Sequence, residues 1–263
     1  MIIDAWLTRG TRGAAALTAM IFATSFASTR ADAAEPPSGA KGARAEIQLG
    51  LCAPTDRIVQ ALALRPSGTP IKVWQFDDAV LTLFGRGVRL RLRVAADGHS
   101  ELTLKVADQD CARLERGLVP SGEGKCEYDV HGASVAGAVS LTRRLSVAST
   151  KELVAGRVAP AQVMSPAQIR YLHEVVRIWP LPTGIRALGP MLLRTYGTPD
   201  KRYDVDISQL PDGVEYAEIS RKVPVADATR VKETMEADLS RVGVDVCADQ
   251  SSQAVNKLRS LLR

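Results

Sequence analysis

Apolar and polar residues alternate with a period of two along several segments of the chain. The clearest segment is 88–94, VRLRLRV, in which single apolar residues separate Arg89, Arg91 and Arg93. Because successive side chains of a β-strand point to opposite faces, this spacing predicts a strand with three guanidinium groups on one face. Like charges at this spacing repel one another, so that face must meet water, carboxylates or an anion such as phosphate.

Further segments alternate in the same way, and each has one face of charged or polar side chains. These faces carry Glu46 and Gln48 (45–51), Glu101, Thr103 and Lys105 (101–106), Lys125, Glu127 and Asp129 (125–130), Arg202, Asp204 and Asp206 (202–207), and Glu218, Ser220 and Lys222 (216–222). Such regular alternation favours antiparallel strands.

Segments with helical periodicity lie between and after these strands. They cover 54–64, 165–176, 227–242 and 251–262. The second begins at Ser165 and Pro166, which are typical of an N-cap and a first helical turn, and should end before Pro180. The strands and helices do not alternate one by one as they would in a series of βαβ units, so we predict an α+β fold. We expect one domain over 46–263, in which the helical segment 150–180 joins two sheet-rich halves and the antiparallel sheet closes or nearly closes.

The first 33 residues have the features of a secretory signal. Arg9 and Arg12 precede an alanine-rich apolar run at 14–27, and the small residues of Ala31-Asp32-Ala33 follow. This pattern predicts cleavage after Ala33, a linker over 34–45 and a periplasmic or secreted protein without a stable membrane span. The alternative is an uncleaved anchor, although the run is short for one. Removing 1–33 lowers the net charge only from +5 to +4, a balance that does not indicate a nucleic-acid partner.

All four cysteines lie beyond the predicted signal, where an oxidising compartment favours disulfides. Four cysteines allow three pairings. We favour Cys111 with Cys126, which flank a short glycine-containing connection, and Cys52 with Cys247, which would join the first strand to the end of the chain. Free buried thiols are the alternative.

The charged strand faces have two interpretations. Each face taken alone fits the wet side of an ordinary antiparallel sheet. The set as a whole is different, because arginines gather on one strand and acids on others. Segregated charge suits a site in which carboxylates hold a hard cation while arginine and lysine hold phosphate oxygens.

Motifs in a particular order carry a resemblance to a known family. The order is Glu-x-Gln-x-Gly (46–50), a helix, WQFDD (74–78), LFGRGVRLRLRV (83–94), LTLK (102–105), CEYD (126–129), LLRTYG (192–197), DVD (204–206) and YAEIS (216–220). It resembles the CYTH superfamily, the triphosphate tunnel metalloenzymes, which include class IV adenylate cyclases, thiamine triphosphatases and inorganic triphosphatases. The resemblance implies an eight-stranded antiparallel tunnel that binds a triphosphate together with Mg²⁺ or Mn²⁺.

The resemblance also implies roles for individual residues. The phosphate-binding residues would be Arg91, Arg93, Lys105 and Arg194, with Arg89 accessory, and the metal ligands would be Glu46, Glu127, Asp129, Asp206 (or Asp204) and Glu218. Among these, Lys105 would stabilise the transferring phosphoryl group, and Glu46, Glu127 or Asp129 would orient the attacking water.

The sequence departs from the family at three of these motif positions. Gln48 replaces an acid and Gly50 a lysine of the opening Glu-x-Glu-x-Lys, and Ser220 replaces the second acid of a later Glu-x-Glu. Fewer carboxylates weaken a cation site. Three functions therefore stay open: an exported metal-dependent triphosphatase acting on tripolyphosphate or a related small anion, a tunnel that binds such anions without turnover, and an envelope scaffold whose charged faces pair with one another.

Overall fold

The computed structural model describes residues 43–111, 124–131 and 134–262. The predicted signal 1–33 and most of the predicted linker lie outside these residues, so both stay predictions. Across the described ranges, no helix combines the length and apolar character needed to cross a bilayer.

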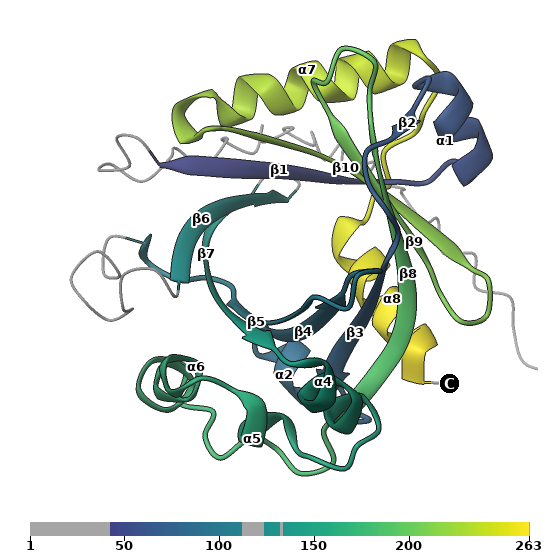
Figure 1. Cartoon of the computed structure of the whole chain (residues 1–263). Helices are drawn as coiled ribbons and strands as arrows, with labels where there is room; N and C mark the ends of the chain where they lie inside the picture. Colours follow the sequence, from purple (N-terminus) through teal and green to yellow (C-terminus); the bar gives the residue numbers. More distant parts are fainter. Residues whose placement is uncertain (1–42, 112–123, 132–133, 263) are drawn as a thin grey trace, which may run out of the picture. The chain divides into compact units, whose positions relative to one another are not determined.

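The described strands form a closed barrel (Figure 1). In spatial order around it they are β8 (Arg186–Gly197), β3 (Ile71–Asp77), β4 (Val88–Val94), β5 (Ser100–Val106), β7 (Ser134–Leu145), β6 (Gly124–His131), β1 (Arg44–Leu51), β10 (Glu215–Pro224) and β9 (Asp204–Gln209). Pairing of β9 with β8 closes the ring, and the short β2 (Arg65–Pro66) adds to β8 outside it.

The prediction of an α+β tunnel is confirmed, but two of its details are wrong. The ring has nine described strands instead of eight, and β1 runs parallel to β6, with Glu46 aligned with Asp129. Alternation shows that a segment is a strand, but it carries no information about the direction of the neighbouring strand. The small residues of β7 also weaken its alternation, so the sequence pattern did not predict this strand.

Helices occupy the segments that helical periodicity predicted, with several short additions. They are α1 (Thr55–Ala61), α2 (Thr82–Gly85), α4 (Val147–Val154), α5 (Pro160–Val163), α6 (Pro166–Tyr171), the π-helical turn η1 (Leu172–Val176), the 3₁₀ turn η2 (Val225–Asp227), α7 (Ala228–Arg241) and α8 (Gln250–Leu262). The predicted N-cap of α6 is present: Ser165 Oγ accepts a hydrogen bond from Gln168 N, and Ser165 N donates to Gln168 Oε1.

Helices cover the outer, apolar faces of the strands on two sides. On one side α1 and α7 pack against β1, β9 and β10, and α7 runs along β1 and β10 (Figure 1). On another side α2, α4 and α6 pack against leucines of β4, β5 and β7. The hydrophobic effect therefore turns the apolar faces outward, under helices. The charged faces that remain line the inside of the barrel.

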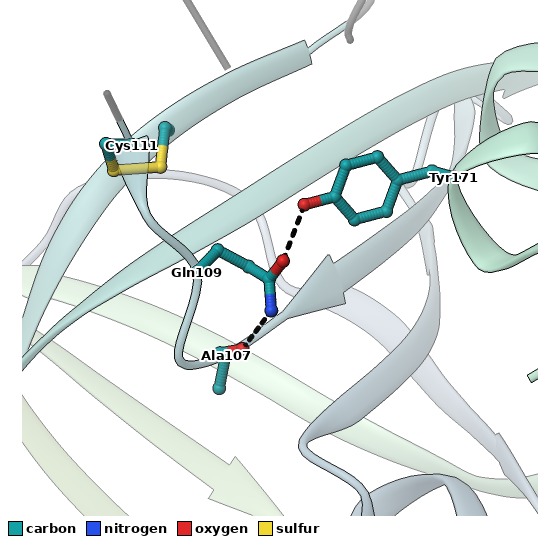
Figure 2. Close-up of a disulfide and its surroundings, with 5 residues drawn as sticks. Ala107, Gln109, Cys111 and Tyr171 are labelled. Atoms are coloured by element: carbon teal, nitrogen blue, oxygen red, sulfur yellow. Dashed lines mark hydrogen bonds between the residues drawn. A yellow bond between two sulfur atoms is a disulfide. The ribbon is translucent and has the colours of Figure 1, made fainter. Parts of the chain in front are cut away.

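Both favoured disulfides are present in the structure. Cys52–Cys247 joins the end of β1 to the segment that leads into α8, where Cys52 N also donates to Asp245 O and Cys247 N to Gly50 O. The second disulfide, Cys111–Cys126, joins the segment after β5 to β6 (Figure 2). All four thiols are therefore used in the fold.

Gln109 fills the space beside the second disulfide (Figure 2). Its Nε2 donates to Ala107 O at 2.8 Å, and its Oε1 accepts from Tyr171 OH at 2.8 Å. Burial of this phenol raises the pKa of Tyr171 to about 12. The backbone approaches so closely here that a Cβ on Gly137 would lie 2.0 Å from Gln109 O, so only glycine fits.

Candidate functional site: the polar tunnel

A cavity of about 610 Å³ lies inside the barrel. Inward-facing side chains of the strands and one face of α8 form its walls. Its polar and charged walls are made by Gln48, Gln75, Arg89, Arg91, Arg93, Thr103, Lys105, Asp206, Ser208, Glu218, Asp249 and Lys257. The polar strand faces that the sequence predicted therefore point toward this cavity.

Three arginines of β4 form a cationic wall of this cavity. Arg89 and Arg91 lie in register with Lys105 and Thr103 of β5. Burial, together with the neighbouring charges of Arg93 and Arg89, lowers the pKa of Arg91 to about 9. The ion pairs among the described residues include none of these three guanidinium groups. The Nε of Arg93 is buried and has no hydrogen-bond acceptor within the described structure. Guanidinium groups that face a cavity without an acid partner are suited to binding an anion.

Lys105 differs from these arginines because it already has an acid partner. Its Nζ lies 2.6 Å from Oδ2 of Asp129 on β6, and Asp129 is only 7% exposed. This pair consumes most of the charge of Lys105 before any ligand enters. Among the residues to which the resemblance assigned a catalytic role, Lys105 thus borders the cavity with its charge already paired with Asp129.

Two acids lie on the opposite wall, on β9 and β10. Asp206 and Glu218 are direct partners in the strand register, and Thr195 Oγ1 donates to Asp206 Oδ1 at 2.6 Å. Protein surrounds the Glu218 carboxyl, although water reaches it through the cavity. This burial raises the pKa of Glu218, and the charges of Asp206 and Glu46 act in the same direction, whereas Lys257 and Arg89 oppose them. Both acids also act on Arg91, which places them within electrostatic range of the arginine wall.

The remaining predicted acids lie toward the β1–β6 contact, outside the cavity walls. Glu46 aligns with Lys222 of β10 and with Asp129. Glu127 pairs with Lys125 at 2.6 Å and with Lys222 at 3.4 Å. Burial acts to raise the pKa of Glu127, but hydrogen bonds and charges of the two lysines outweigh it, and the net shift is downward.

The predicted metal ligands are thus divided between two places. Asp206 and Glu218 face the cavity, while Asp129 and Glu127 are paired with lysines. No group of three or more acids, histidines or cysteines in the described chain is arranged to hold a metal ion. The donor set therefore does not fit a Mg²⁺ or Mn²⁺ site built by the protein alone.

Arg194 does not reach the tunnel, contrary to its predicted role in phosphate binding. It lies on the outer face of β8, in register with Ile207 of the outer apolar cluster. There it forms an ion pair with Glu215, whose other carboxyl oxygen accepts from Thr55 at the start of α1. Side chains of β8 alternate between the two faces of the strand, and the inward positions are Leu193 and Thr195. The match by motif order therefore chose a residue whose side chain points outward.

The structure adds Lys257 of α8 to the site. Its Nζ donates to Ser208 Oγ at 2.7 Å. Burial lowers the pKa of Lys257, whereas the charges of Glu218 and Asp206 act to raise it. Helical periodicity at 251–262 predicted this helix, but it carried no signal that Lys257 would line the cavity of a barrel.

A closed barrel with a polar, cationic interior and an apolar exterior under helices is the architecture of CYTH-type tunnel proteins, and the fold of this chain is CYTH-like. Solved structures support this assignment. The one that carries the assignment is the candidate adenylyl cyclase HpAC1 from Hippeastrum, described as having a dominant triphosphatase activity. It superposes with a TM-score of 0.53 over 81% of this chain and 94% of its own, at 16% identity.

A second solved structure gives a similar but lower score. The candidate adenylate cyclase bh2851 from Bacillus halodurans has a TM-score of 0.49 at 14% identity, over 78% of this chain and 92% of its own. Identities this low concern the fold alone. No family profile and no curated protein sequence matches the chain.

Proposed function

We propose that this protein binds a triphosphate or a similar short polyphosphate inside the barrel. The observation that carries the proposal is the row of Arg89, Arg91 and Arg93, which face the cavity without ion-pair partners among the described residues. Burial and the charges of Arg93 and Arg89 lower the pKa of Arg91, so holding three guanidinium charges along this cavity wall is unfavourable. A polyanion relieves this repulsion, and each phosphate offers acceptors for the forked donors of arginine.

Hydrolysis of the bound phosphoanhydride is the second candidate function. It is supported by the triphosphatase activity described for the Hippeastrum protein of similar fold. Glu218 is the cavity acid best suited to assist, because its raised pKa favours taking a proton from water. In that step the water oxygen attacks a terminal phosphorus, the anhydride bond breaks, the proton passes to the carboxylate, and the arginines stabilise the departing phosphate.

The described acids offer no complete metal site, so metal dependence does not enter this mechanism. Export is part of the proposal, because two disulfides suit an oxidising compartment.

Titration calorimetry with tripolyphosphate tests the proposal. We expect the wild-type protein to bind and Arg91→Met to lose about tenfold or more in affinity, the effect of one charge-assisted hydrogen bond. The matched control is Arg157→Met, because Arg157 is exposed and forms its ion pair with Glu152 of α4, away from the cavity walls. No heat of binding to the wild-type protein, or equal affinity of both variants, would refute binding in the tunnel. Phosphate release measured on the same samples separates binding from turnover.

A further inference from the structure

The inference concerns α8 and rests on the proposed function. This helix is held against the barrel at several points. The Cys52–Cys247 disulfide anchors the segment before it. Leu258 packs with Leu81 and Leu188, and Leu261 contacts the cluster around Met191. Figure 1 shows α8 beside β8. The position of Lys257 on this helix is therefore determined by packing and a covalent bond, and not only by its own side chain.

The ammonium group of Lys257 lies within electrostatic range of both cavity walls. It donates a hydrogen bond to Ser208 of β9, which lies two residues along the strand from Asp206. Glu218 and Asp206 attract it, and Arg91 and Arg89 repel it. An ammonium has three donors, of which Ser208 takes one, so two are left for an acid or a phosphate oxygen.

The charge balance of the cavity depends on this lysine. Apart from Lys105, whose charge Asp129 offsets, four cationic side chains and three acidic ones line the walls, so without Lys257 the positive and negative charges are equal in number. Mg²⁺ is usually held by one or two carboxylates together with phosphate oxygens. Asp206 and Glu218 are the register-paired acids that could serve in this way, and they are the two acids whose charges act on Lys257. A divalent ion and the ammonium would therefore compete for the same carboxylates.

We propose that Lys257 is a built-in cation of the tunnel, which takes the place of a divalent ion beside Asp206 and Glu218 and lets the barrel bind a triphosphate-type anion without metal. The loss of acids at Gln48 and Ser220 agrees with this arrangement, because a site neutralised by lysine needs fewer carboxylates than a metal site. The helix thus supplies the charge that the strands alone do not provide.

Calorimetric titration with tripolyphosphate, in EDTA and separately with Mg²⁺, tests the inference. We expect the wild-type protein to bind in EDTA, and Lys257→Met to lose about tenfold in affinity there, with Mg²⁺ restoring most of the loss. Lys257→Arg keeps the charge and should bind in EDTA. The matched control is Lys232→Met, because Lys232 pairs with Glu236 on α7 and not with any residue of the cavity.

The outcomes separate the inference from the proposed function. Wild-type binding that requires Mg²⁺ overturns the inference and leaves the function standing, as does unchanged binding by Lys257→Met in EDTA. No wild-type binding in either buffer overturns both. The wild-type comparison needs no variant, so it can overturn the inference even if Lys257→Met does not fold, and Lys257→Arg then supplies the second test.

Discussion

Asp206 and Glu218 face one another across the β9–β10 ladder, with both carboxyl groups on the inner wall of the barrel. Paired acids in one enclosed space repel each other unless a cation lies close by. The nearby cations are Lys257 of α8 and the arginines of β4. This arrangement of two acids and several cations controls both the stability of the empty tunnel and what it can bind.

Replacing Arg91 should stabilise the empty protein. Because burial and neighbouring arginines lower the pKa of Arg91 to about 9, its charge destabilises the folded state at neutral pH. We expect Arg91→Met to melt a few degrees above the wild type at pH 7 in low salt, a shift on the order of 1 kcal/mol in the free energy of unfolding. Differential scanning calorimetry measures it. Tripolyphosphate should raise the melting temperature of the wild type more than that of the variant, because the variant binds it more weakly. A lower melting temperature for the empty variant would contradict the repulsion argument.

The pH dependence of stability should reveal Glu218. The folded state raises the pKa of Glu218 above its ordinary value of 4.5, so the folded protein holds this proton more tightly than the unfolded chain does. The stabilisation of the folded state by this proton is complete below about pH 4.5 and is lost as pH rises through the folded pKa. We expect Glu218→Gln to gain stability relative to the wild type between pH 4 and pH 7, and urea unfolding at both values measures it. A difference that shrinks over this interval would show the opposite shift. Glu236→Gln, on the exposed side of α7, is the control.

The two disulfides should have different functional consequences. Replacing both members of a pair by serine costs about 3 kcal/mol for a short loop and about 4 to 5 kcal/mol for a long one in the chain-entropy account. The sequence separations are 15 residues for Cys111–Cys126 and 195 for Cys52–Cys247. We expect loss of Cys52–Cys247 also to weaken tripolyphosphate binding, because that bond anchors the segment before α8.

Loss of Cys111–Cys126 should lower stability without changing the affinity for tripolyphosphate. This pair is therefore the matched control for the loss of affinity expected when the segment before α8 is released. Thermal melts and binding titrations of the two double variants make the comparison. Intact mass before and after reduction establishes that the wild-type sample carries both bonds. Equal affinity of the two variants would show that the Cys52–Cys247 bond does not influence the cavity.

Gln168 should be one of the most sensitive positions outside the tunnel. Its side chain is 0% exposed, and Nε2 donates to Leu102 O at 3.0 Å and to Leu141 O at 2.9 Å, which ties α6 to β5 and β7. Removing these donors leaves buried carbonyl groups unsatisfied, so we expect Gln168→Leu to lose about 2 to 3 kcal/mol. Gln168→Glu should lose more at neutral pH, because a buried carboxylate would face two carbonyl oxygens. Urea unfolding at pH 7 ranks the two variants, and a more stable Glu variant would disprove this role of the donors.

Much of the fold follows from local patterns in the sequence. Alternation at 88–94 or 216–222 and helical periodicity at 227–242 correspond to β4, β10 and α7. The N-cap at Ser165 and both cysteine pairings also agree with the structure. These features depend on the residues themselves and their near neighbours, or on the small number of ways to pair four cysteines.

By itself, the sequence determined that each strand has one apolar and one charged face, and that one strand carries three arginines. Only the tertiary structure decided that the charged faces point inward, because this depends on which faces the helices cover. It also placed β1 parallel to β6, Arg194 on the outside and Lys257 on the inside. Strand direction, the phase of β8 and the docking of α8 arise from contacts between residues far apart in the chain, and no local pattern of hydrophobic and polar residues contains them.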